Sequence, residues 1–158
     1  MDETVSFTDR YVRTGGLKVH LLEGGAGTPL LLIHGLGGPR MWQRVLVPLS
    51  KRFRVMAVDL PGFGDSDPVS GNAAVRDAVS GNPAMSRHGT AVRDMARPNR
   101  DPTGRDFSFK GYGEFLSEVM EKMEVRHAVV CGISWGGQLA VRLADSHPEC
   151  VTSICSIT

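Results

Sequence analysis

The stretch VVCGISWGGQLAVRLA, residues 129–144, joins an apolar run to a helical pattern at a single serine, Ser134. The apolar residues in front of the serine predict a buried strand. The residues behind it predict a helix that stops before Pro148. One side of this helix would carry Leu139, Ala140, Leu143 and Ala144. Ser134 is therefore predicted to lie in a tight turn between a strand and a helix.

The neighbours of Ser134 indicate why a hydroxyl would be placed there. A sharp strand-to-helix turn lifts a side chain to the carboxyl edge of a sheet, and its crowding tolerates only small residues two positions before and after. Gly132 and Gly136 occupy those positions. The free N–H groups and positive dipole end of the helix would face any negative charge formed nearby. Because an alcohol reacts only when accessible and activated by a base, Ser134 is a candidate nucleophile.

Outward from this stretch, the chain alternates strands and helices. An alternating segment around Gly15 and Gly16 predicts an antiparallel hairpin. Apolar runs predict strands at 30–33, 55–58 and 151–157, and helical spacing predicts helices at 42–49 and from Tyr112 onward. We expect an α/β fold with a mostly parallel sheet, an antiparallel N-terminal hairpin and helices on both faces.

Composition and charge exclude several classes of protein. The 158 residues fit a single domain, 1–158, and the apolar content of 41% and charged content of 22% are ordinary for a globular chain. A formal net charge of +1 gives no support for nucleic-acid binding. The acidic N-terminus does not resemble a signal peptide, and no window reaches about 20 apolar residues, so we expect a cytoplasmic protein without a membrane span.

Two further expectations concern an insert and the cysteines. The segment 69–106 is rich in Gly, Pro, Ser, Asn, Asp and Arg and lacks large apolar residues other than Met, which predicts a low-complexity, disordered surface insert. It could alternatively form part of a lid over a pocket. The three cysteines, Cys131, Cys150 and Cys155, are expected to be buried free thiols. The histidines show no spacing typical of a metal site, so no metal is expected.

Three motifs resemble the α/β-hydrolase fold family. GISWG at 132–136 resembles that family's nucleophile elbow, which has the pattern G-x-S-x-G. HGLGG at 34–38 is similar to its oxyanion loop, and DLPGFGDS at 59–66 is similar to a turn of its esterase-like and lactonase-like members. The three motifs occur in the family's order. The resemblance implies an incomplete α/β-hydrolase core that needs no cofactor.

The resemblance also assigns roles to residues. It implies that Ser134 is the nucleophile and that the backbone N–H groups of Leu36 and Trp135 form the oxyanion hole. His34, Gly35 and Gly37 would form the loop beside the site, where the glycines could alternatively serve only the turn. His34 is expected to stabilise this turn rather than act as the base, and Trp135 could line an acyl pocket or simply pack. The residues Asp59, Asp65 and Ser66 are expected to hold the following turn through local hydrogen bonds.

A serine nucleophile narrows the expected chemistry. Relatives that dehalogenate or open epoxides carry aspartate at the elbow, which disfavours those reactions here. The remaining reaction is acyl transfer to water, with a small-molecule ester, thioester or lactone as substrate. Hydrolysis of a carbon–carbon bond in a diketone also remains. The alternatives are a non-catalytic ligand-binding module and a nonfunctional truncated fragment.

The family's catalytic acid and histidine are expected downstream of the serine. Only 24 residues follow Ser134, and His147 among them would lie about 20 Å away at the far end of the helix. We therefore interpret the chain as an N-terminal portion of the family's domain, from a truncated or mis-spliced gene, with negligible turnover by itself. The terminal strand would be an uncovered sheet edge, which predicts self-association.

Overall fold

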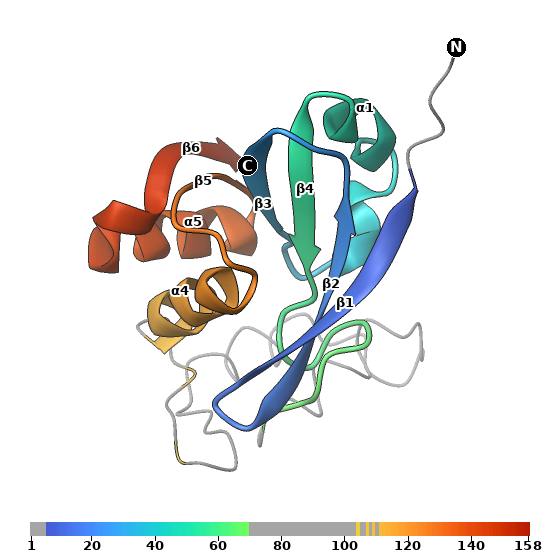
Figure 1. Ribbon diagram of the computed structural model, residues 1–158. Coiled ribbons are helices and arrows are strands. Elements are labelled where there is room, and N and C mark those ends of the chain that lie inside the picture. Colours follow the sequence, from blue (N-terminus) through green and yellow to red (C-terminus); the bar gives the residue numbers. More distant parts are fainter. Residues whose placement is uncertain (1–5, 70–103, 105–106, 108, 110) are drawn as a thin grey trace.

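The fold is a single six-stranded sheet with helices on both faces (Figure 1). The computed structural model describes residues 6–69, 104, 107, 109 and 111–158. The strands lie in the order β1-β2-β4-β3-β5-β6. Their bounds are β1 Phe7–Thr14, β2 Leu17–Gly24, β3 Thr28–Ile33, β4 Phe53–Val58, β5 Ala128–Ile133 and β6 Val151–Ile157.

Strand directions follow from the connections between the strands. The hairpin of β1 and β2 turns at Gly15 and Gly16, which both have positive φ, and β2 pairs antiparallel with β4. The four strands β4, β3, β5 and β6 are mutually parallel. The expected α/β class, with a mostly parallel sheet and an antiparallel N-terminal hairpin, is confirmed.

Two long helices cover one face of the sheet, and two short ones cover the other (Figure 1). On the first face, α4 spans Gly111–Lys122 and α5 spans Trp135–Ser146. On the second face, α1 spans Leu46–Ser50 and the 3₁₀ turn η1 spans Pro39–Trp42. A further 3₁₀ turn, η3, spans Pro148–Cys150 and leads into β6.

The core consists of two apolar layers, because successive residues of a strand point to opposite faces. Leu31 and Ile33 of β3 pack with α4 and α5, whereas Leu30 and Leu32 pack with Trp42 on the other face. The expected apolar stripe of α4 is buried in the first layer. Its members in α4 are Phe115, Leu116, Val119 and Met120, and Met123, just after the helix, is buried with them.

The helix expected at 42–49 is wrong as a continuous element. The chain forms η1, leaves it after Trp42 and begins α1 only at Leu46. Pro48 explains the break, because a helix running through it would lose a backbone hydrogen bond and place the proline ring against the carbonyl of Arg44. In α1, Pro48 lies in the first turn, where its missing N–H costs nothing.

The first residue of the expected insert belongs to the core. Val69 is 2% exposed and packs in the first layer. The remaining residues of the predicted insert lie outside the described residues, apart from Gly104, which has a φ of 85°. Phe107, just after the insert, is buried against Tyr112 and Phe115.

The cysteines are free thiols, but only Cys131 is buried. Burial, together with the neighbouring Cys155 thiol, raises the pKa of Cys131 to about 12. Cys150 is half-buried and Cys155 is exposed, which corrects the expectation that all three are buried. Cys155 is exposed because β6 forms the edge of the sheet and most of its residues face solvent.

None of the helices in the described part of the chain is long and apolar enough to cross a membrane.

We predict that the packing of α5 against the sheet is a main source of stability. Leu139 of α5 is completely buried, so Leu139→Ala should lower the free energy of unfolding by about 2–5 kcal/mol through lost apolar contact and a residual cavity. Its exposed neighbour gives the control, because Gln138→Ala should change stability by less than about 0.5 kcal/mol. Urea denaturation followed by circular dichroism measures both, and equal effects would contradict the packing.

Candidate active site

Ser134 lies at the turn between β5 and α5, where the two elements meet without an intervening loop. Its backbone has φ 53° and ψ −117°, a conformation that costs a non-glycine residue about 1–3 kcal/mol. The residue is exposed. Its amide donates a hydrogen bond of 2.6 Å to the carbonyl of Ile157 at the end of β6. The strained turn thus presents the hydroxyl at the carboxyl edge of the parallel strands.

The glycines around Ser134 are required by direct contact between backbones. A Cβ on Gly132 would collide with the backbone of Gly136, and a Cβ on Gly136 would collide with the carbonyl oxygens of Ile33 and His34. A Cβ on Gly35 would lie 2.8 Å from the carbonyl oxygen of Ile133 and 3.2 Å from Cβ of Ser134. The loop after β3 and the turn after β5 are therefore in contact.

Two backbone amides beside Ser134 are available to a ligand. Trp135 is the first residue of α5, where an N–H has no acceptor within the helix. Leu36 lies in a turn closed by the 3.1 Å hydrogen bond from Gly38 N–H to the Gly35 carbonyl. Neither amide donates a hydrogen bond to another described residue. These are the two groups that the sequence predicted for an oxyanion hole.

His34 is held by two backbone hydrogen bonds. The Leu60 amide donates to Nε2 over 3.1 Å, and this leaves Nδ1 protonated to donate to the Gly35 carbonyl over 2.7 Å. The side chain is completely buried, and burial lowers its pKa below 6.5. His34 is thus a neutral structural group that joins the loop after β3 to the turn after β4.

The turn after β4 is organised around Asp59. Its carboxylate accepts a hydrogen bond of 3.0 Å from the Asp65 amide, and its carbonyl accepts one of 2.6 Å from the Ser66 hydroxyl. The local role expected for Asp59, Asp65 and Ser66 is confirmed. A side chain at Gly64, which has a φ of 50°, would collide with the Asp59 carboxylate.

His20 joins this turn to the N-terminal hairpin. Its ring contacts the Asp59 carboxylate at 2.8 Å through Nδ1 and the Asp9 carboxylate at 2.9 Å through Nε2. It is only 6% exposed. Burial alone would lower the pKa of His20, but the hydrogen bonds and charges of Asp59 and Asp9 outweigh it and raise the pKa above 6.5.

His20, Asp59 and Ser66 do not form a catalytic triad. The Ser66 hydroxyl donates to the Asp59 carbonyl and accepts a bond from the His20 backbone amide, so it does not contact the imidazole ring. Both ring nitrogens of His20 are occupied by carboxylates. The cluster is a structural bridge between β1, β2 and the turn after β4.

No base reaches Ser134 within the described residues. Its hydroxyl makes no hydrogen bond with any of them. His147 follows the last turn of α5, about 20 Å along the helix axis from Ser134. Its ring contacts Glu114 at 3.0 Å and Glu149 at 3.3 Å. The structure therefore separates this histidine from the serine, in agreement with the spacing in the sequence.

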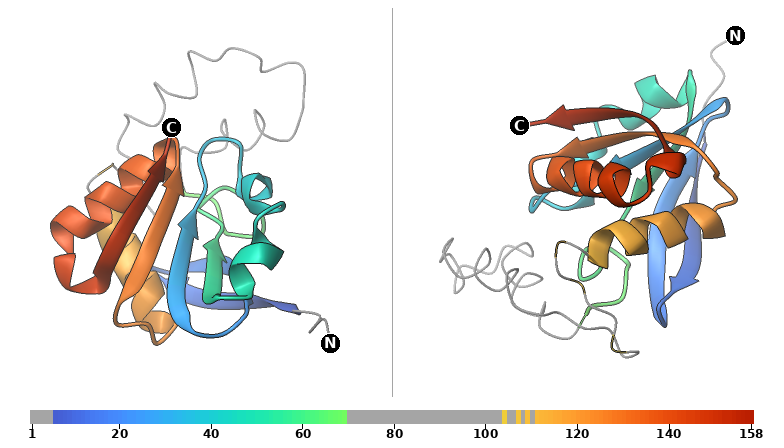
Figure 2. Two further views of the ribbon diagram at one scale, coloured as in Figure 1. Left: turned by 90° about the horizontal axis from the view of Figure 1, so that it is seen from above. Right: turned by 90° about the vertical axis from the view of Figure 1, so that its left-hand side faces the viewer.

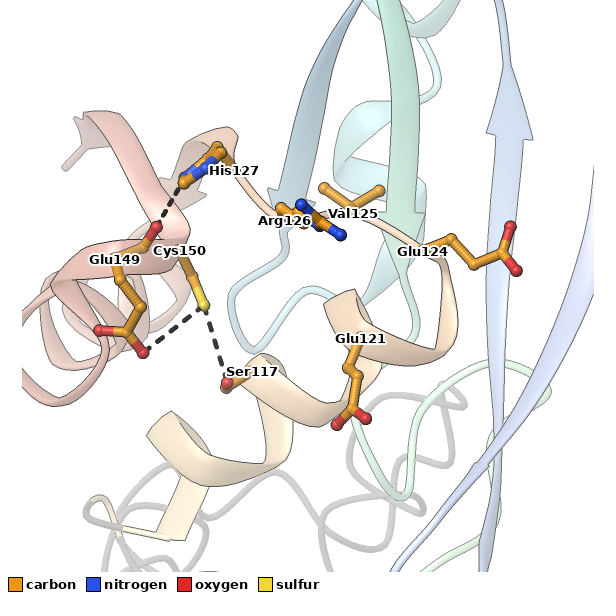
Figure 3. A pocket seen from close by; sticks show the side chains of 8 residues that line it. All are labelled: Ser117, Glu121, Glu124, Val125, Arg126, His127, Glu149 and Cys150. Atoms are coloured by element: carbon orange, nitrogen blue, oxygen red, sulfur yellow. Dashed lines mark hydrogen bonds between the residues drawn. The ribbon is translucent and has the colours of Figure 1, made fainter.

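An open pocket of about 690 Å³ lies at the opposite end of β5 from Ser134 (Figure 3). Helix α4, the segment before β5 and the η3 turn form its walls. Within it, His127 Nδ1–H donates a hydrogen bond of 2.7 Å to the Glu149 carbonyl. The strand length of six residues separates it from Ser134 by about 20 Å. This pocket cannot hold a substrate that reacts at Ser134.

No cluster of potential metal ligands occurs in the residues that the structure covers.

Comparison with known proteins agrees with this geometry. The profile of a family described as alpha/beta hydrolase fold matches residues 28–158. The chain belongs to the α/β-hydrolase fold family. The partial α/β-hydrolase core expected from the sequence is confirmed.

Three similar proteins illustrate the range of this hydrolase family. The chain is 30% identical over 145 residues to 2-hydroxymuconate semialdehyde hydrolase of Pseudomonas sp. (strain CF600), covering 89% of the chain and 39% of that protein. It is 26% identical to fluoroacetate dehalogenase of Burkholderia sp, covering 94% and 40%. The crystal structure of a membrane phospholipase A matches with a TM-score of 0.63 and 30% identity, covering 95% and 39%. The chain thus spans about 40% of the length of each.

We predict that Gly136 tolerates no side chain. Gly136→Ala should lower the free energy of unfolding by about 1–3 kcal/mol, because the added methyl would collide with two backbone carbonyls that cannot move independently of β3. Gly37→Ala is the control, since its Cβ would approach only the flexible Met41 side chain, at 3.0 Å from the sulfur. Thermal unfolding compares the two variants, and a Gly136→Ala protein as stable as Gly37→Ala would contradict the contact.

We also predict a pH-dependent contribution from His20. A raised folded-state pKa means that the stabilisation by its charged form is fully present below pH 6.5 and is lost as the pH rises through the folded-state pKa. The stability difference between wild type and His20→Gln should therefore shrink as the pH rises from about 6 to about 9. Urea denaturation at a series of pH values measures it. The exposed Thr8→Ala variant should follow the wild-type profile, and a difference that grows with pH would refute the bridge.

Proposed function

We propose that the chain supplies the nucleophile and oxyanion hole of a serine hydrolase that acts on a carboxylic ester or related acyl compound. The observation that carries the proposal is the exposed, strained Ser134 between two available amides, those of Leu36 and Trp135. In this reaction the Ser134 oxygen attacks the acyl carbon, a base takes the hydroxyl proton, and the carbonyl oxygen becomes an oxyanion. Each amide donor of an oxyanion hole can contribute about 3–4 kcal/mol to transition-state stabilisation.

The surroundings of Ser134 support this assignment. Gly35 and Gly136 allow the loop after β3 to approach the turn closely, which brings the Leu36 amide into the neighbourhood of the serine. The N-terminus of α5 adds its positive dipole end. Trp135, the residue after Ser134, packs edge-to-face on Tyr112 with ring centroids 5.1 Å apart, which fixes an apolar side chain at the start of α5. This apolar surface suits an acyl group.

The similar proteins act on chemically different substrates. One is a hydrolase of a semialdehyde, one is a dehalogenase and one is a phospholipase, so the shared fold does not select one substrate. Serine at the elbow favours acyl transfer over dehalogenation, because acyl transfer can pass through an acyl-serine that water hydrolyses. A small-molecule ester is the substrate that we propose, and the site needs no cofactor for this chemistry.

The second candidate is a non-catalytic ligand-binding module. The observation that favours it is the absence of an imidazole or carboxylate hydrogen-bonded to Ser134 among the described residues. A hydroxyl between two free amides could then bind a carbonyl or carboxylate oxygen without reacting. Turnover that depends on Ser134 would exclude the binding module, since only the hydrolase requires a base near Ser134.

Labelling with a serine-reactive fluorophosphonate tests whether Ser134 is the nucleophile. With a fluorophosphonate in excess and long incubation, Ser134 should be the serine modified most rapidly, because its attack alone is assisted by the oxyanion amides. Peptide mass spectrometry locates the label. Ser134→Ala should abolish it, and the matched exposed-serine variant Ser153→Ala should retain it. Equal labelling of several serines, or labelling that survives Ser134→Ala, would remove the assignment.

Turnover by the 158-residue chain should be negligible. In a serine protease, loss of the base reduces kcat on the order of a millionfold. No described group can replace the base at Ser134. Hydrolysis of a p-nitrophenyl ester by the chain should therefore equal that of its Ser134→Ala variant. A rate clearly above that variant would show that a base reaches Ser134 and would favour the hydrolase over the binding module.

A further inference from the structure

Hydrogen bonds connect strand β2 to the loop after β3 in one continuous chain of donors and acceptors. The strands β2, β4 and β3 lie side by side in the sheet, so the hydrogen bonds run across three neighbouring strands (Figure 2). Each member after the first accepts a hydrogen bond from the member before it. In order from β2, the members are the His20 amide, the Ser66 hydroxyl, the Asp59–Leu60 peptide, the His34 ring and the Gly35–Leu36 peptide.

The first half of this hydrogen-bond chain fixes the peptide between Asp59 and Leu60. The His20 amide donates to the Ser66 hydroxyl over 2.9 Å, and this hydroxyl donates to the Asp59 carbonyl over 2.6 Å. Because the peptide bond is trans, its N–H points away from its carbonyl, and the Leu60 amide donates to His34 Nε2 over 3.1 Å. Ser66 and His34 thus hold opposite sides of one peptide plane.

The second half transmits the same direction through the His34 ring to another peptide. A backbone amide can only donate, so the Leu60 amide requires an unprotonated Nε2, and the neutral ring carries its proton on Nδ1. Nδ1–H donates to the Gly35 carbonyl over 2.7 Å, and the Gly38 amide donates to the same oxygen over 3.1 Å. This peptide bond is also trans, so the Leu36 N–H points away from both donors.

Burial strengthens the hydrogen bonds of this chain. His34 is completely buried, Ser66 is 5% exposed and Asp59 is 4% exposed. The rings of His34 and Phe63 pack at 62° with centroids 4.8 Å apart, which holds the imidazole plane. In a low local dielectric, successive hydrogen bonds polarise one another by about 10–30% per bond. Because all the donors point in the same direction, their dipoles add at the last one, the Leu36 N–H.

The last peptide of the chain lies beside the serine, since a Cβ on Gly35 would be 3.2 Å from Cβ of Ser134. We propose that Ser66 and His34 are positioning residues of the oxyanion hole, which orient the Gly35–Leu36 peptide and strengthen its N–H as a donor to an oxyanion at Ser134. This inference rests on the proposed hydrolase function. Ser66 acts through His34 and not by contact with the substrate.

The first test compares two buried serines by the rate constant for fluorophosphonate labelling of Ser134. Ser66→Ala should lower this rate constant roughly threefold, because the phosphoryl oxygen would lose about a fifth of one oxyanion hydrogen bond. Ser50→Ala is the matched control and should label as the wild type does. Ser50 is 3% exposed and its hydroxyl also donates to a carbonyl, that of Val47, but outside the hydrogen-bond chain.

Both serine variants lose a buried hydrogen bond, so the labelling rates are compared per folded molecule, with the folded fraction taken from urea denaturation. A role of Ser66 in stability alone predicts equal rate constants for Ser66→Ala and Ser50→Ala. That result would overturn the proposal.

Two substitutions of His34 separate its two hydrogen bonds. In His34→Asn, the side-chain amide N–H takes the place of Nδ1–H and can still donate to the Gly35 carbonyl. In His34→Gln, the longer side chain places its polar atoms near the position of Nε2, where they reach the Leu60 amide instead. Labelling of Ser134 should therefore be slower in His34→Gln than in His34→Asn, and the reverse order would contradict the orienting role.

A further test uses the wild-type chain and needs neither labelling nor a variant. Long-range ¹H–¹⁵N NMR correlations show which ring nitrogen of a histidine carries the proton. At pH 7, His34 should be neutral, because burial lowers its pKa, and its proton should be on Nδ1 and exchange slowly with solvent. A proton on Nε2 would interrupt the hydrogen-bond chain and overturn the proposal.

The outcomes distinguish this inference from the proposed function. Selective labelling of Ser134 with equal rate constants in Ser66→Ala and Ser50→Ala, or with His34 protonated on Nε2, overturns the inference and leaves the hydrolase function supported. Unselective labelling of several serines in the wild type removes the hydrolase function, and the positioning role falls with it.

Discussion

The structure depends on a contact between two stretches of backbone, where the turn after β5 meets the end of β3. Gly132 and Gly136 allow the chain to fold on itself, and Gly136 also lies against the carbonyls of Ile33 and His34. Because no side chain intervenes, the ends of the neighbouring parallel strands β3 and β5 are held in direct backbone contact. The position of Ser134 relative to the Leu36 amide follows from this contact and not from any interaction of the serine side chain.

Two buried histidines maintain the surrounding loops in different charge states. His34 is neutral because both of its ring nitrogens are committed to backbone groups and burial disfavours the charged form. His20 favours its charge because two carboxylates face it. Neither ring is available for proton transfer at Ser134. The electrostatic contribution to the site therefore comes from amides and the dipole of α5, which suit an oxyanion but cannot remove a proton.

Sequence reasoning succeeded where structure is determined by nearby residues. The strand, glycine turn and helix around Ser134 follow from short-range patterns, as does α4 with its buried stripe. It failed where distant segments decide the outcome. His20 looks like an outward-facing residue of an alternating strand, and only the Asp59 turn, 39 positions away, buries it. The helix expected at 42–49 failed for a local reason, because Pro48 does not allow a helix to run through from Trp42 and α1 begins only at Leu46.

The exposure of Cys155, like the burial of His20, is decided by the arrangement of distant segments and not by neighbouring residues. An apolar strand is normally buried on both faces when it lies inside a parallel sheet. In β6 the sequence has that character, yet the described residues leave it at an edge. Composition reports what environment suits a strand, whereas its position in the sheet determines the environment that it has.

The bond from the Ser134 amide to the Ile157 carbonyl makes the outermost strand a support for the strained turn. When the end of β6 frays, that turn loses an acceptor and can relax toward an unstrained backbone, which would move the hydroxyl. Any interaction that orders β6 would in consequence favour the strained backbone at Ser134, and a ligand that requires this backbone would favour ordering of β6 by the same free energy. Edge and site are therefore energetically linked although no side chain connects them.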